Sequence, residues 1–165
     1  MIKRIMICLG LLVMTSAMHA QKVIFPQVQQ AGTATSAVSD GTYTLGNDLL
    51  TATFIHADGH LTFGGCEAMG LKAANDLFSI RLANGTEIAS SAMTLNSVNL
   101  RNLSGDPTAA KGALKLAGKA VEASFTSGDL QLTWRAVLRD GSHYLRTELE
   151  LTAVADVAMN AIWSE

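Results

Sequence analysis

The chain has 165 residues, of which 48% are hydrophobic, 5% aromatic and 16% charged, and its 12 Lys and Arg stand against 14 Asp and Glu for a formal charge of −2. A weakly acidic chain lacks the basic surface by which proteins bind nucleic acids and anionic membranes. Its length is that of a single domain, and its apolar content is sufficient for a hydrophobic core.

The first twenty residues have the pattern of a secretory signal peptide. Lys3 and Arg4 supply the positive start, an apolar run extends from Ile5 to Met14, and small residues lead to Ala20. This run is far shorter than the ~20 residues that cross a bilayer. We therefore predict cleavage after Ala20, export to the periplasm or the cell exterior, and no membrane span.

Cleavage there would change both the charge and the cysteine content. It would remove Lys3 and Arg4 but no acidic residue, which lowers the formal charge to −4, and Cys66 would remain as the single cysteine. An exported chain with one cysteine forms no internal disulfide. We therefore expect its stability to come from its core.

The rest of the chain divides into a polar leader, predicted for residues 21–41 with at most one edge strand, and a domain predicted for residues 42–165. Apolar and polar residues alternate with period two in this domain. The predicted strands are 49–57, 60–64, 77–82, 87–98, 120–126, 130–138 and 143–153. Many of these strands are separated by pairs of residues that tolerate the positive φ of tight turns. The turn pairs are Asp58-Gly59, Asn84-Gly85, Gly128-Asp129 and Asp140-Gly141. The pattern predicts an all-β, antiparallel β-sandwich.

The segment 106–119 is ambiguous. Asp106 followed by Pro107 is typical of a helix start. Gly112 and Gly118 would each cost ~1 kcal/mol relative to Ala in a helix, and no long apolar stripe offsets that cost. We therefore favour a loop that leads into a short strand.

Two turns predict the register of the last three strands. If residues 128–129 and 140–141 are both two-residue turns, each places Leu132, Trp134 and Ala136 on the buried face, and a slip by one residue would reverse that face. The predicted cross-strand pairs include Leu132–Phe125, Leu132–Leu149, Trp134–Thr147 and Arg135–Arg146. Trp134 is accordingly expected in the core rather than on a sugar-stacking surface.

The opposite face of these strands carries the candidate binding residues. Arg135 and Arg146, with Glu122 and Glu148 in reach, form either an anion or substrate clamp or a solvated charge lattice, and the lattice is the commoner meaning of such a row. Tyr144 and Trp163 are freer to face a ligand, so the candidate site residues are Arg135, Arg146, Tyr144 and Trp163.

The sequence patterns of catalytic and metal-binding sites are weak or absent. Glu148 and Glu150 share one strand face as a glycosidase carboxylate pair would, but they lie outward and a solvated face is favoured. His56, His60 and His143 are too scattered for a metal signature, and the sequence has no phosphate loop and no nucleophile elbow. We predict no catalytic residue, no metal and no cofactor.

The stretches LQLTWRAVLRDGSHYLRTELELTAVADVAMNAI, YTLGNDLLTATF and LTFGGCEAMG together carry a family resemblance. They resemble the N-terminal region of large exported glycoside hydrolases of the gut Bacteroidetes type, in which a galactose-mutarotase-like sandwich precedes an α-galactosidase-like barrel. The resemblance implies a mutarotase-like supersandwich. It also implies a non-catalytic module of a carbohydrate-active enzyme, because such families keep their catalytic aspartates in the barrel that this sequence lacks.

The end of the sequence bears on this expectation. The chain stops after the run 157–162 without a capping turn, which is typical of a fragment truncated at its C-terminus. The expected partner is then carbohydrate or the missing barrel domain. One alternative is a free-standing carbohydrate-binding protein that uses Tyr43, Tyr144 or Trp163. Another is a sugar epimerase, which would need a His and a carboxylate converging in one pocket.

Overall fold

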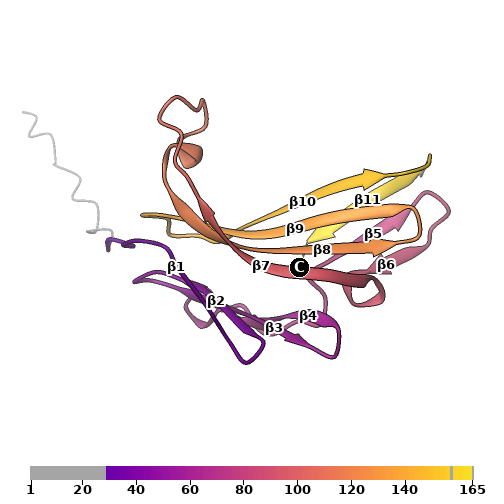
Figure 1. Ribbon diagram of the computed structural model, residues 1–165, viewed down its shortest axis with the longest axis horizontal. Helices are drawn as coiled ribbons and strands as arrows, with labels where there is room; N and C mark the ends of the chain where they lie inside the picture. Colours follow the sequence, from indigo (N-terminus) through magenta and orange to yellow (C-terminus); the bar gives the residue numbers. More distant parts are fainter. Residues whose placement is uncertain (1–28, 157, 165) are drawn as a thin grey trace, which may run out of the picture.

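The computed structural model describes residues 29–156 and 158–164, and these residues form the predicted all-β antiparallel sandwich (Figure 1). The first sheet has the order β1-β2-β3-β4, with β1 at Thr35–Ser39, β2 at Thr42–Gly46, β3 at Thr51–Ala57 and β4 at His60–Gly65. The second sheet has the order β10-β9-β8-β7, with β7 at Thr94–Leu103, β8 at Gly118–Ser127, β9 at Leu130–Arg139 and β10 at Arg146–Ala153. The predicted signal peptide and most of the leader's first half lie outside the described residues.

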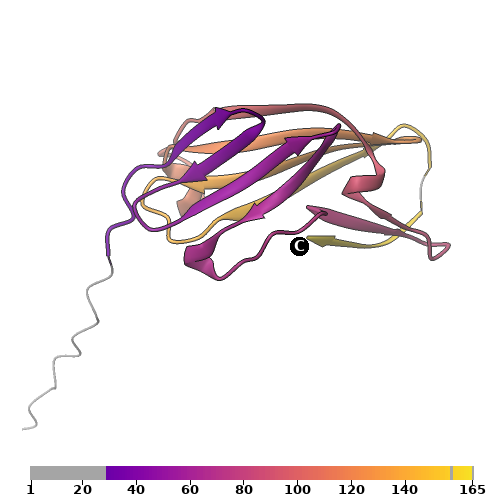
Figure 2. The ribbon, with the colours of Figure 1, turned by 90° about the horizontal axis from the view of Figure 1, so that it is seen from below.

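A third, smaller sheet lies beside this pair of sheets (Figure 2). It has the order β11-β5-β6, with β5 at Phe78–Leu82, β6 at Glu87–Ala89 and β11 at Met159–Ser164. Short 3₁₀ turns occur at Glu67–Met69, Ser90–Ala92 and Gly112–Lys115. No helix among the described residues is long and apolar enough to cross a membrane.

The core lies where the inner faces of the sheets meet. Alternate residues of β3, β8 and β9 point inward, as period-two sequences require. Phe54 of the first sheet contacts Trp134 of the second edge-on, with ring centroids 5.4 Å apart. Phe78 of the third sheet meets Phe125 of the second in the same geometry, also at 5.4 Å. Aromatic contacts therefore connect the second sheet to each of the other two.

Several hairpins have the tight turns that their turn residues favour. Asp58 and Gly59 have φ of 51° and 77°, which is the positive φ that a tight hairpin turn needs, and Ala57 pairs with His60 as predicted. Asp40 and Gly41 form the same kind of turn between β1 and β2. The first sheet thus begins at Thr35, within the segment predicted as a leader, and β1 is its edge strand.

The prediction of one strand over residues 87–98 is wrong. The chain forms β6, turns at Ser90–Ala92 and then enters β7 of a different sheet. Side-chain hydrogen bonds hold this turn, because the Leu77 N–H donates to Ser90 Oγ at 2.8 Å and the Ser91 N–H donates to Asp76 Oδ1 at 2.8 Å. These long-range bonds interrupt a run whose local pattern favours a continuous strand.

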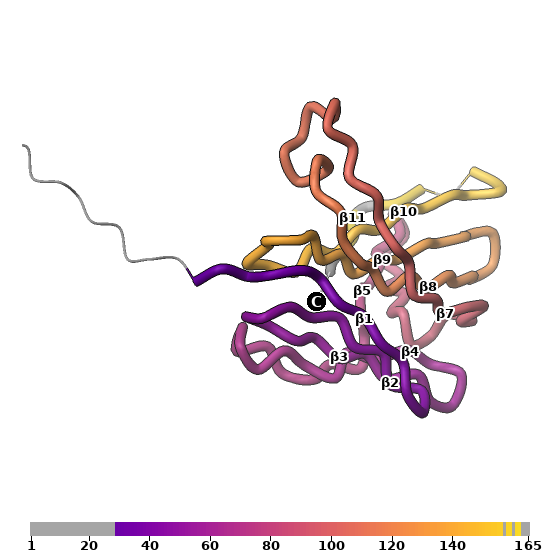
Figure 3. The backbone as a smooth tube through the Cα atoms, turned by 60° about the vertical axis from the view of Figure 1, so that its left-hand side comes forward, coloured from indigo at the N-terminus to yellow at the C-terminus, as the bar shows by residue number. Residues whose placement is uncertain are grey.

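The loop predicted for the start of segment 106–119 is confirmed. It contains one 3₁₀ turn at Gly112–Lys115 and leads into β8 at Gly118. Figure 3 shows this connection between β7 and β8 standing away from the sheets.

The register of the last three strands is partly as predicted. Leu132 pairs with Phe125 and Trp134 pairs with Ala123, which confirms the β8–β9 register. The β9–β10 register is wrong by two residues, since Leu132 pairs with Leu151 and Trp134 with Leu149. A slip of two residues retains the faces, so Trp134 is still buried.

The cause of this slip is the connection at residues 140–145, which is longer than a two-residue turn. The carboxylate of Asp140 accepts a hydrogen bond from the Ala34 N–H at 2.9 Å. The Gly141 N–H donates to the Gly32 carbonyl at 2.8 Å. The N-terminal segment therefore holds this connection open, and β10 begins only at Arg146.

The last strand of the chain is paired, although the sequence has no capping turn after residues 157–162. β11 pairs antiparallel with β5 (Figure 2). Ile162 lies opposite Ile80. This pairing is available because β6 occupies only the other edge of β5.

Candidate functional site

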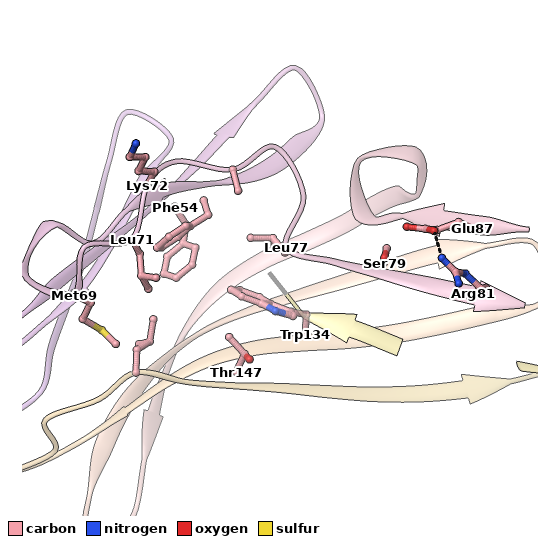
Figure 4. A pocket seen from close by; sticks show the side chains of 13 residues that line it. Phe54, Met69, Leu71, Lys72, Leu77, Ser79, Arg81, Glu87, Trp134 and Thr147 are labelled. Atoms are coloured by element: carbon pink, nitrogen blue, oxygen red, sulfur yellow. Dashed lines mark hydrogen bonds and ion pairs between the residues drawn. The ribbon is translucent and has the colours of Figure 1, made fainter. Parts of the chain in front are cut away.

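A cleft of about 790 Å³ opens where all three sheets approach the loop that follows β4 (Figure 4). Its apolar lining is Phe54, Phe63, Met69, Leu71, Ala74, Leu77, Trp134 and Leu145. Its polar lining is Lys72, Ser79, Arg81, Glu87 and Thr147. A concave, mainly apolar cleft with a few polar groups is the usual form of a ligand site in proteins.

The loop after β4 forms one wall because its backbone is bonded to that strand. Phe63 and Ala74 exchange backbone hydrogen bonds of 3.0 and 2.9 Å. Gly70 ends the 3₁₀ turn in the left-handed conformation, with φ of 68°, which reverses the chain toward the cleft. Met69 and Leu71 on either side of it are 40% and 46% exposed. The rim of the cleft is therefore apolar and open to solvent.

Trp134 carries an unpaired donor in the core beside the cleft. Its side chain is confirmed in the core, where the residue is 2% exposed, and it contacts Phe54 edge-on. The indole Nε1–H has no hydrogen-bond partner among the described residues. A buried donor left unpaired costs about 1–3 kcal/mol, and this nitrogen is buried from the cleft as well as from solvent.

An ion pair lies at one end of the cleft, where the third sheet forms the wall. Arg81 of β5 and Glu87 of β6 form an ion pair of 3.1 Å, drawn as a dashed line in Figure 4. Hydrogen bonds from Arg81 and Ser79 hold the pKa of the Glu87 carboxyl below its usual value. Glu87 is therefore ionised and balanced by Arg81, which makes it a poor general acid at neutral pH.

The candidate residues Arg135 and Arg146 lie on the outer face of the second sheet, away from the cleft lining. The predicted Arg135–Arg146 pair is wrong, because Arg135 lies opposite Glu148. Arg135 contacts Glu122 at 2.7 Å and Glu150 at 3.3 Å, and Arg146 pairs with Glu148. Arg101 of β7 adds a second contact to Glu122 at 2.8 Å. Each guanidinium of this row thus has a carboxylate partner.

The two aromatic candidates lie apart from that row. Tyr144 is in the connection between β9 and β10 and is 54% exposed. The backbone of Trp163 pairs with that of Ser79, and its side chain lies outside the described part of the chain. None of the candidates whose side chains are described lines the cleft. The sequence gives no signal for the cleft, because its walls come from segments that are far apart along the chain.

The metal-ligating side chains of the described residues do not converge on one point. Within residues 29–156 and 158–164, no group of three or more His, Cys, Asp or Glu is placed to hold a metal ion. His143 donates to the Gln29 carbonyl at 2.8 Å when its Nε2 carries the proton, and no histidine is among the described residues that line the cleft. Cys66 is a buried free thiol. No family model matches the chain, and no curated protein or solved structure matches it either.

The Glu122 carboxylate predicts how stability depends on pH. Partial burial raises its pKa, but hydrogen bonds from Arg135 and Arg101 outweigh burial, and the net pKa is lowered. A lowered pKa stabilises the fold above the unfolded-state value of about 4.3, and this stabilisation is lost as the pH falls through the folded-state value. Glu122→Gln should therefore lower the free energy of unfolding at pH 7 by on the order of 1 kcal/mol. Its difference from wild type should shrink below pH 4 in urea titrations, and a difference that is constant from pH 3 to 7 would contradict this.

Proposed function

We propose that the chain is a non-catalytic β-sandwich module of an exported carbohydrate-active enzyme, and that it packs against a catalytic barrel domain. The observation that carries this proposal is the open apolar rim of the cleft at Met69 and Leu71. Exposed apolar side chains beside a cavity are typical of surfaces that bind a partner or ligand. The resemblance of the stretch 134–146 to exported glycoside hydrolases supplies the class of enzyme.

The state of the carboxylates supports the non-catalytic part of the proposal. Glu148 and Glu150, the pair with the spacing of interest, are on the outer face of β10 and are bound to Arg146 and Arg135. A glycosidase needs one protonated and one free carboxylate facing each other across a substrate. Two carboxylates on one strand that are both held by guanidinium groups do not meet this requirement.

Activity measurements test the non-catalytic part. Purified protein spanning residues 21–165 should not hydrolyse aryl α- or β-glycosides above the rate of the buffer. The Glu148→Gln variant is the matched control, because it removes one carboxylate while retaining the strand. Turnover by the wild-type protein that Glu148→Gln abolishes would overturn the proposal.

The module part has a separate test. The DNA downstream of the Glu165 codon should encode a barrel domain, either in the same frame or as an adjacent gene. A barrel encoded there and expressed with this chain should co-purify with it, and the double variant Met69→Asp, Leu71→Asp should weaken that association. Co-purification that this variant leaves unchanged would exclude the cleft rim as the contact.

The second candidate is a free-standing carbohydrate-binding protein. Tyr144 favours it, because an exposed ring on a connection between strands can stack on a sugar. Calorimetric titration with a glycan panel decides between the two. Binding that Tyr144→Ala removes and Tyr144→Phe retains would favour this candidate over the module.

A further inference from the structure

We propose that two copies of the chain bind each other through the outer faces of their first sheets, β1-β2-β3-β4. This goes beyond the proposed function, because it concerns the face of the sheet opposite to the cleft-lining residues Phe54 and Phe63 and needs no barrel domain. Figure 2 shows the first sheet from this outer side, and no segment of the described chain crosses it.

The outer face of the first sheet carries no Lys, Arg, Asp or Glu, although 16% of the chain is charged. The outer face of the second sheet, in contrast, carries the ion-paired row around Arg135. Interface centres are depleted of charged residues, and an uncharged face can meet an identical face without like-charge repulsion. The registers place these residues on the outer face: Thr35, Ala37, Ser39, Thr42, Thr44, Gly46, Thr51, Thr53, Ile55, Ala57, His60, Thr62 and Gly64.

The threonine hydroxyl groups of this face are already bonded within the sheet. Each of four threonines donates a hydrogen bond of 3.1–3.4 Å to a backbone carbonyl of the neighbouring strand, and these are Thr35, Thr44, Thr53 and Thr62. A hydroxyl that keeps such a partner costs less to remove from water than a free one. The face can therefore be covered at a low cost in desolvation.

The same face has one projecting apolar side chain and one hollow. Ile55 is 43% exposed. A groove of about 530 Å³ lies along β4 and is bordered on the sheet by Thr53 and Gly64. A β-bulge opposite Thr53 places Gly64 there, where a Cβ would lie 2.4 Å from Thr53 Oγ1. The charged residues that line the groove, Glu67 and Lys72, belong to the loop after β4 and not to the sheet.

This arrangement is self-complementary. Most homodimers have two-fold symmetry, in which the same surface of each copy forms the contact. Ile55 and Thr53 are two positions apart on β3, about 7 Å along the strand. A two-fold axis between them would place Ile55 of each copy in the groove of the other, so that both hollows are filled.

The size of the face sets the expected affinity. Four strands at a spacing of about 4.8 Å and a length of about 20 Å give a footprint of roughly 400 Å² per copy. A standard interface buries roughly 800 Å² per partner. We therefore expect a weak dimer, with a dissociation constant on the order of 10–100 μM.

Sedimentation equilibrium of purified protein spanning residues 21–165 measures this dimer. Between about 1 μM and about 1 mM, the apparent mass should rise from that of one chain toward that of two. Ile55→Lys should weaken the dimer at least about tenfold, because each copy would place a charge in the groove of the other. Gln131→Lys is the control, since it adds the same charge to an exposed position of the second sheet, and it should have less than about a twofold effect.

Disulfide cross-linking tests the arrangement itself. An isotopically labelled Ile55→Cys protein mixed with a Thr53→Cys protein should form a mixed disulfide on oxidation, whereas Ile55→Cys mixed with Gln131→Cys should not. The native Cys66 is buried and does not compete.

A single-chain mass at every concentration would overturn the proposal. A dimer that Ile55→Lys leaves intact, or that Gln131→Lys weakens equally, would overturn it as well. Circular dichroism shows whether Ile55→Lys folds, and the cross-linking result decides if it does not. None of these outcomes depends on a barrel domain, so they are independent of the tests of the proposed function.

Discussion

Replacing Trp134 by Ala should lower the free energy of unfolding by about 3–5 kcal/mol. The side chain is almost fully buried, and the change removes its edge-on contact with Phe54. The lost volume adjoins the cleft, so neighbouring side chains cannot fill it without moving the strands. Chemical denaturation followed by circular dichroism measures this effect without relying on tryptophan fluorescence.

Gln131→Ala is the matched control for this variant, because Gln131 is on the same strand and exposed. Its effect should stay within about 0.5 kcal/mol, as for most surface substitutions. A denaturation midpoint for Trp134→Ala equal to that of wild type would mean that the indole does not pack in the core, and the stacking role for Trp134 would return.

Phe125→Ala should have a comparable effect, about 3–5 kcal/mol, and should act mainly on the third sheet. Phe125 of β8 contacts Phe78 of β5 edge-on, with an interplanar angle of 85°. Loss of the ring removes a direct aromatic contact between the second and third sheets. Amide hydrogen exchange should therefore show a larger loss of protection in β5 and β6 than in β2 and β3.

A double-mutant cycle with Phe78→Ala isolates the aromatic pair. Its coupling energy should be about 0.5–1.5 kcal/mol, the value typical of edge-on rings. Phe125→Leu is the conservative control and should cost less than half as much as the alanine variant, because most of the volume is retained. Additive effects at the two positions, or uniform loss of protection over all sheets, would show that the pair does not couple the sheets.

The sequence predicted those features that short segments determine. Alternation placed Trp134 inward and Arg135 outward, and a Gly with φ of 55° at Gly128 produced the predicted β8–β9 register. The connection at residues 140–145 begins with a similar turn pair, yet its geometry depends on a hydrogen bond that the Gly32 carbonyl accepts and one that the Ala34 N–H donates. A local pattern contains no information about such partners, so the β9–β10 register was wrong by two residues.

The cleft was not predictable either, because its walls also depend on residues that are distant in the sequence. Phe54, Leu71, Ser79 and Trp134 line one cavity but come from distant parts of the sequence. Each of them has an ordinary local role, as a core aromatic, a loop apolar residue or a strand serine. The unpaired Nε1–H of Trp134 became visible only once its surroundings were known.

The hydrogen bond between the Ala34 N–H and the Asp140 carboxylate can form only late in the synthesis of the chain. The two residues are 106 positions apart in the chain. A ribosome that adds roughly 5–20 residues per second would release Asp140 on the order of 5–20 s after Ala34. The first sheet, which is made of adjacent hairpins, can form early, but its apolar face stays uncovered until β8 and β9 emerge. We therefore expect the newly made N-terminal half to be more accessible to chaperones and proteases during this interval than it is in the finished protein.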